Sequence, residues 1–82
     1  MAETSPAALL ELLARSLVDH PDEVEVTEVP ESDGELVLEL EVAEVDLGRV
    51  IGRGGRVANA LRSVVRASAT QSEQRILVDI LD

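Results

Sequence analysis

The residues with the clearest chemical potential in this chain are glycines and arginines gathered in one short segment. Positions 50 to 57 read V-I-G-R-G-G-R-V, so glycine stands at 52, 54 and 55 and arginine at 53 and 56. Glycine has no Cβ, which permits positive φ values and lets a bulky group approach the main chain. Arginine supplies positive charge in a geometry that suits phosphate oxygens. The segment therefore predicts a site for a phosphate-bearing ligand.

Two other phosphate-binding motifs do not fit this segment. A dinucleotide-binding fingerprint needs its third glycine at position 57, which is valine, and a strand rather than a helix before the loop. A P-loop needs Gly-Lys followed by Ser or Thr, and the chain contains no lysine. The remaining pattern is G-x-x-G, from Gly52 to Gly55, between two predicted helices. It leads into the N-terminal end of the second helix, where unpaired N–H groups and the helix dipole favour an anion.

The charge of the chain is divided along its length. The formal net charge is −10, yet residues 48–72 contain five arginines and no acidic residue, whereas residues 1–47 contain fourteen acidic residues and one arginine. We interpret the acidic part as a surface that keeps the protein soluble. The basic part extends the predicted binding side of the loop through Arg49, Asn59, Arg62 and Arg66.

Composition limits the function classes. A chain of 82 residues with aliphatic but no aromatic side chains predicts one small domain, residues 1–82. The absence of cysteine, of a long apolar run and of a basic N-terminal region predicts a soluble, cytoplasmic protein. His20, the single histidine, is assigned a structural or solvent-facing role, and the turn 31–34 lacks the calcium ligands of an EF-hand. We expect no enzymatic activity, metal or cofactor.

The hydrophobic spacing predicts six elements in the order α-β-β-α-α-β. Ser5-Pro6 marks the start of the first helix and Asp33-Gly34 a hairpin turn, and Asp46 is expected to cap the short helix. The first two strands should pair antiparallel and the last two parallel, so the fold class is α+β: a three-stranded mixed sheet covered on one face by three helices. The predicted ranges are a helix from Pro6 to before His20, strands over 24–27 and 36–42, a helix over 47–51, a helix from Arg56 to about Thr70, and a strand over 76–81.

These features resemble a known family. The G-x-x-G loop between two helices looks like the KH-domain signature, and the element order matches the type II, prokaryotic form. The stretches D-L-G-R-V-I-G at 46–52 and V-D-I-L-D at 78–82, with the chain length, are similar to the stand-alone bacterial KH proteins of the KhpA (YlqC-like) family. The resemblance covers essentially the whole chain.

The resemblance implies a single-stranded RNA-binding protein, an RNA chaperone or post-transcriptional regulator whose loop 52–55 clamps the backbone of about four nucleotides. It also implies an aliphatic groove for the bases, lined by Ile51, Val57 and either Ile76 or Val78. The partners it implies are single-stranded RNA, a second copy of the chain, and a larger KH protein of the Jag type. The predicted RNA-binding residues are Arg49, Ile51, Gly52, Arg53, Gly54, Gly55, Arg56, Val57 and Asn59.

Two alternatives remain at this point. The loop could be a tight structural turn and the arginines a solvated face, which would leave a protein-interaction adaptor with a vestigial RNA site that acts by pairing with another KH protein. The pairing surface is itself a separate prediction. Val57, Leu61 and Val64 are expected to face the sheet, so the neighbouring flank of the helix, Ala58, Val65 and Ala69, is expected to pair with a partner. The outer face of the sheet around Val37, Leu77 and Leu81 ranks second because carboxylates surround it.

Overall fold

The first helix begins and ends where its sequence signals predict. In the computed structural model, which describes residues 5–69 and 74–82, the Ser5 hydroxyl accepts a hydrogen bond of 3.1 Å from the Ala8 amide, and Pro6 occupies the first helical position. The helix, α1, spans Pro6–Leu17. It ends before His20-Pro21, because proline disfavours the helical conformation in the residue that precedes it. The cap and the stop are therefore local properties of the sequence.

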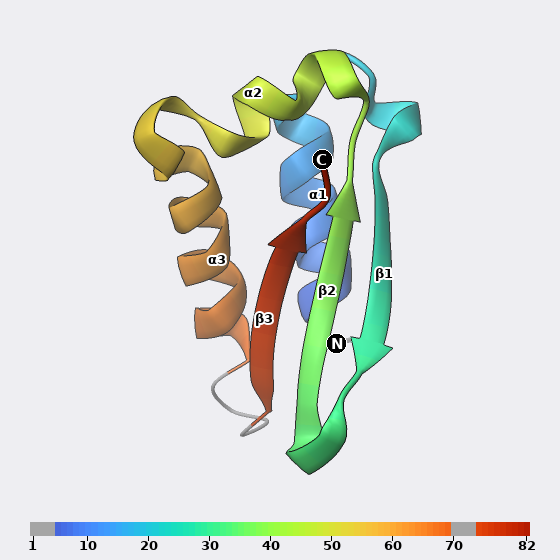
Figure 1. The fold of residues 1–82 in the computed structure, drawn as a ribbon, viewed down its shortest axis with the longest axis vertical. Coiled ribbons are helices and arrows are strands. Elements are labelled where there is room, and N and C mark those ends of the chain that lie inside the picture. The colour runs from blue at the N-terminus through green and yellow to red at the C-terminus, as the bar shows by residue number, and fades with distance from the viewer. Residues whose placement is uncertain (1–4, 70–73) are drawn as a thin grey trace, which may run out of the picture.

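The remaining elements follow in the predicted order around a three-stranded sheet (Figure 1). Strand order is β1-β2-β3; β1 is antiparallel to β2 and β3 is parallel to β2. The α+β fold class is thereby confirmed. Thr70, the predicted last residue of the long helix, lies outside the described residues. The element bounds are β1 Glu25–Pro30, β2 Glu35–Glu41, α2 Leu47–Ile51, α3 Arg56–Ser68 and β3 Arg75–Ile80.

The hairpin between β1 and β2 turns at the predicted dipeptide. Asp33 and Gly34 have φ values of 64° and 75°, and the Glu35 amide donates a hydrogen bond to the Ser32 carbonyl. Two consecutive positive φ values at the centre of such a turn are the mark of a type I′ hairpin. Pro30 is the last residue of β1, an edge strand where a missing N–H is tolerated.

The helices lie on one face of the sheet. Helix α1 packs against β1, α3 packs against β3, and the two helices contact each other. The short α2 crosses the end of the sheet in Figure 1 and packs mainly against α3. Alternate residues of β2 point into the layer between sheet and helices, which explains why Leu36, Leu38 and Leu40 are buried. The core also contains Leu10, Ala14, Val24, Val50, Leu61, Val65, Ala69, Ile76 and Val78.

The outer face of the sheet carries much of the acidic charge. Glu25 lies opposite Glu41 across β1 and β2, and Glu39 lies opposite Asp79 across β2 and β3. Like charges in directly opposite positions repel one another and do not stabilise a sheet. This face is therefore electrostatically unfavourable for phosphate, and the predicted binding loop lies elsewhere.

The face of α3 that enters the core differs from the predicted one. Ala58, Val65 and Ala69 are buried, whereas Val64 is 47% exposed. The apolar arc of this helix is wide enough for two contact faces, and the small side chains of Ala58 and Ala69 lie on the half that meets the core. The predicted pairing flank is thus wrong, because it is already occupied by the core of the same molecule.

Candidate nucleic-acid interface

The loop between α2 and α3 is built from glycines in conformations that other residues rarely adopt. Gly52 ends α2 with φ of 74°, Gly54 follows with φ of 64°, and Gly55 precedes α3 with φ of 79°. The Gly55 amide donates a 3.1 Å hydrogen bond to the Gly52 carbonyl and closes the turn. Three positive φ values within four residues require glycine, since side chains with a Cβ are strained there.

The glycines differ in what surrounds the missing Cβ. A Cβ on Gly52 would lie 2.4 Å from Val57 Cγ2 and 2.8 Å from the Val57 nitrogen, so the loop packs directly on the first turn of α3. A Cβ on Gly54 would meet nothing within 4 Å. Gly52 is therefore required by packing inside the fold, whereas the surface over Gly54 is open to a ligand.

The loop places positive charge at the N-terminal end of α3. Gly55 occupies the N-cap position without a side-chain cap, and the first turn of the helix contains no acidic residue. Arg53, at the tip of the loop, and Arg56, at the first helical position, are both exposed. The helix dipole disfavours a cation at this end, and a bound anion relieves that cost. The arrangement favours a phosphate above Gly54.

Three predicted polar residues border the loop but are engaged with other groups. Arg49 Nη1 lies 3.1 Å from Asp19 Oδ1 in an exposed ion pair, which contributes little to stability and can be exchanged for a phosphate. Asn59 accepts a 3.2 Å hydrogen bond from Arg62 Nη1, and Arg62 Nε donates to the Val78 carbonyl on β3 at 3.3 Å. Arg62 thus orients Asn59 and fastens α3 to β3.

The predicted aliphatic groove is only partly present. Ile51 is 38% exposed, so it can contact a base, whereas Val57 is half-buried and lines an apolar groove on the α1 side of α3. Ile76 and Val78 do not join Ile51 in the predicted groove, because both are buried in the core beneath α3, and Ile76 lines only a separate cleft beside Arg66. The alternation of β3 turns them inward.

Sequence reasoning missed one cleft beside α3. Arg66 and Arg75 line it, together with Gln74, Ile76 and Leu77. Arg75 lies outside the uninterrupted basic segment, because Glu73 precedes it in the chain. Parallel pairing of β3 with β2 brings Arg75 opposite Glu35. The alternation of polar and apolar residues in β3 was the sequence signal that could have placed Arg75 at the start of this strand.

Asp46, the residue predicted to cap α2, is buried and has other partners. Asp46 is 1% exposed and forms no side-chain cap on α2. Its carboxylate instead accepts hydrogen bonds from the Asp19 amide at 3.2 Å and the His20 amide at 3.0 Å, and it lies 3.1 Å from His20 Nδ1. The carboxylate points toward the segment at residues 19 and 20 because that segment offers two main-chain donors and a ring nitrogen.

The same contacts shift the pKa values of Asp46 and His20. Burial alone would raise the pKa of the Asp46 carboxyl, but hydrogen bonds from the Asp19 amide and from the ring and amide of His20 outweigh it and hold this pKa below its ordinary value. The hydrogen bond to Asp46 raises the pKa of the His20 imidazole, against the effect of burial. The His20 side chain is 46% exposed and paired with Asp46, so it combines the two alternatives, structural and solvent-facing, that the sequence left open.

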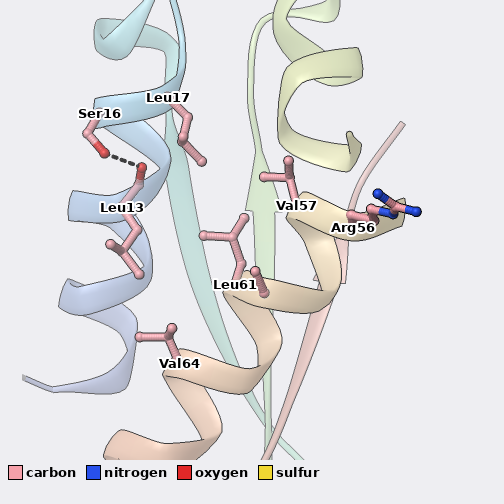
Figure 2. Close-up of a pocket in the computed structure, with 8 residues that line it drawn as sticks. Leu13, Ser16, Leu17, Arg56, Val57, Leu61 and Val64 are labelled. Atoms are coloured by element: carbon pink, nitrogen blue, oxygen red, sulfur yellow. Dashed lines mark hydrogen bonds between the residues drawn. The ribbon is translucent and has the colours of Figure 1, made fainter. Parts of the chain in front are cut away.

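An apolar groove of about 350 Å³ separates α1 from α3. Figure 2 shows Leu13 and Leu17 of α1 pointing toward Val57, Leu61 and Val64 of α3, while the Arg56 guanidinium points away from the groove. The Ser16 hydroxyl donates a hydrogen bond to the Leu13 carbonyl, so it adds little polarity. The groove extends to Arg56 and Val57 at the start of α3, directly after the binding loop.

Other kinds of site are not found in the part of the chain that the structure describes. Over residues 5–69 and 74–82, His, Asp and Glu side chains form no group of three or more that could hold a metal ion. No helix in these ranges is long and apolar enough to span a membrane.

The fold and the loop together define a KH domain of type II. The element order, the mixed sheet and a G-x-x-G turn between α2 and α3 are the features of that class. A solved structure with the same fold is that of an Era variant from Aquifex aeolicus bound to GDP.AlF4-. The match covers 92% of this chain and 29% of the Era chain, with a TM-score of 0.65 and 17% identity.

Sequence comparison places the chain within one family of that class. The model for the KH domain of KhpA/KhpB matches residues 7–80, and the chain belongs to this family. It is 49% identical over 73 residues to the RNA-binding protein KhpA of Clostridium acetobutylicum, covering 89% of this chain and 96% of the relative. It is 52% identical over 75 residues to the KhpA of Halalkalibacterium halodurans, covering 90% and 96%. Both relatives are named for RNA binding, and neither name states a catalytic activity.

Proposed function

We propose that this protein binds single-stranded RNA in the bacterial cytoplasm, without catalysis, as an RNA chaperone or post-transcriptional regulator. One observation carries the proposal: the positive-φ turn from Gly52 to Gly55 opens the N-terminal end of α3 beside Arg53 and Arg56, and a side chain at Gly54 would meet nothing. A phosphodiester can approach the main chain there and be held by N–H groups and arginine. The RNA-binding names of the relatives support the same function.

The strand is expected to run from the loop along the side of α3 that meets β3. Arg62, Arg66 and Arg75 border this side, while Ile51 offers an aliphatic contact near the loop. Val57 lines the groove toward α1 and contacts RNA only where the strand crosses the start of α3. The chain has no aromatic side chain, so it lacks the base stacking that contributes about 1–3 kcal/mol per base in other single-strand binders. Binding should therefore be weak per nucleotide and weakly selective for sequence.

Salt dependence tests whether this basic side is the binding face. If about three arginines contact phosphates, log K should fall with log salt at a slope of roughly −2, which is about a 20-fold loss of affinity between 50 and 200 mM salt. Fluorescence anisotropy of a labelled single-stranded RNA oligonucleotide measures the slope. The same oligonucleotide in a duplex should bind less well, because the loop needs an unstacked backbone. A slope near zero would contradict the assignment of the basic side.

The groove between α1 and α3 supports a second property, pairing with another KH domain. Val64 and Leu17 are 47% and 38% exposed, and Leu12 on the same helix as Leu17 is 64% exposed. Uncharged side chains line the groove except at its edge, where Arg56 lies. Two copies can therefore meet there without bringing carboxylates together, as they would on the outer face of the sheet. We propose a homodimer through this groove, and a larger KH protein of the Jag type as an alternative partner.

Pairing through the groove predicts opposite outcomes for two arginine substitutions. Val64→Arg should weaken the dimer by at least about 30-fold, since the two-fold axis brings in a charge from each copy and burying both without partners costs at least about 2 kcal/mol in total. Ser63→Arg, the exposed neighbour on α3, is the matched control and should leave the dimer intact. Sedimentation velocity over a concentration series gives both constants. A dimer that survives Val64→Arg but is lost in Leu77→Arg would assign pairing to the outer sheet face instead.

A further inference from the structure

Asp46 is the buried charged residue of the described part of the chain, and it lies directly before α2. A buried carboxylate is costly unless hydrogen bonds satisfy it. Three donors do so here, the amides of Asp19 and His20 and the ring of His20, and all three belong to the corner that follows α1. The carboxylate thus joins two segments that are 26 and 27 residues apart in the sequence.

The helix that follows Asp46 is too short to be stable without contacts to other parts of the molecule. Helix α2 has five residues, and an isolated helix of that length does not form in water. It packs mainly against α3 and buries Val50 fully, while the Asp19–Arg49 ion pair links it to the corner that follows α1. Asp46 and Arg49 both reach the corner at residues 19–20. The position of the N-terminal end of α2 is therefore set by this corner, and α3 supports the rest of the helix.

The far end of α2 is the binding loop. Five residues of helix span only about 7 Å, so a tilt of α2 at Leu47 also displaces Gly52 at its other end. Gly52 cannot absorb such a displacement, because it packs closely against Val57 at the start of α3. A change in the direction of α2 must then alter the turn from Gly52 to Gly55.

We propose that Asp46 is a positioning residue of the RNA site: its carboxylate fastens the start of α2 to the corner after α1 and so sets the backbone of the turn that receives the phosphate. This proposal rests on the proposed function. In the absence of the carboxylate, the amides of Asp19 and His20 lose their acceptor, α2 is released, and the turn samples arrangements that do not bind.

The test compares Asp46→Ala and Asp46→Asn in two measurements. The amide resonances of Gly52, Gly54 and Gly55 in ¹H–¹⁵N spectra, recorded without RNA, should shift in Asp46→Ala while those of the β-strands stay in place. Affinity for a labelled single-stranded RNA oligonucleotide should fall about tenfold if the competent turn drops to about a tenth of the population. Asp46→Asn keeps one acceptor oxygen and should show a smaller loss, so it reports on the site even if Asp46→Ala does not fold.

The controls separate positioning from stability and from the proposed function. Leu38→Val, in the buried centre of β2, lowers stability without touching α2 and should leave the affinity of the folded protein unchanged. Unshifted loop resonances with wild-type affinity in Asp46→Ala would overturn the proposal, and so would an equal loss in Leu38→Val. If Arg53→Asp with Gly54→Asp fails to weaken RNA binding, the proposed site is wrong, while the resonances still decide whether Asp46 positions the turn.

Discussion

Replacing both Arg53 and Gly54 by aspartate should lower RNA affinity by roughly 1,000-fold and leave the fold almost unchanged. The substitutions remove a charge-assisted contact with phosphate, worth about 1.5–3 kcal/mol, and add repulsion, for a total near 4 kcal/mol. The fold should tolerate them because Arg53 is exposed and a Cβ on Gly54 meets nothing within 4 Å. Aspartate also accepts the positive φ of Gly54 better than most residues do. Anisotropy titration and circular dichroism measure the two effects.

The chain provides a matched control for this variant. Gly34 has φ of 75° and equally open surroundings, and Arg15 is an exposed arginine on α1. Arg15→Asp with Gly34→Asp changes the net charge by the same amount at positions outside the loop. It should bind RNA nearly as well as the natural chain, apart from a small general electrostatic loss. Equal losses in the two variants would mean that overall charge, and not the loop, governs binding.

Replacing Gly52 by alanine should be the most destabilising single change in the loop, at about 3 kcal/mol. The added Cβ would stand 2.4 Å from Val57 Cγ2 and 2.8 Å from the Val57 backbone nitrogen, and main-chain atoms of a helix cannot move aside cheaply. The backbone of Gly52, with φ of 74° and ψ of 171°, lies in a region essentially limited to glycine and adds about 1–3 kcal/mol of strain. In a domain of this size, about 3 kcal/mol lowers the melting temperature by roughly 12–24 °C. Thermal unfolding followed by circular dichroism measures the shift.

Gly54→Ala separates the two causes. Gly54, with φ of 64° and ψ of 19°, is in the left-handed helical region and has open surroundings, so only a backbone strain of about 1–2 kcal/mol should appear. Adding Val57→Ala to Gly52→Ala removes Cγ2 but leaves the backbone contact, and it should restore only part of the stability. If Gly52→Ala proves no worse than Gly54→Ala, the close packing of the loop on α3 is not what requires glycine there.

The sequence alone determined the features that depend on local interactions. Ser5-Pro6 starts α1, Asp33-Gly34 forms the I′ turn, and alternation identifies β2, because caps, turns and strand faces follow from residues close together in the chain. The position of the G-x-x-G loop belongs to this group as well. Its glycines stand between two short helical patterns, and each adopts the positive φ that only glycine takes freely.

The tertiary structure decided which of several possible partners each residue meets. The apolar arc of α3 offered two faces, and contact with the core and β3 selected Ala58 and Val65 while leaving Val64 at the α1 groove. Asp46 could have capped α2, but donors from residues 19 and 20 were closer in the folded chain. These outcomes depend on contacts between segments far apart in the sequence, where several arrangements satisfy the same local pattern and only the packing of the whole domain distinguishes them.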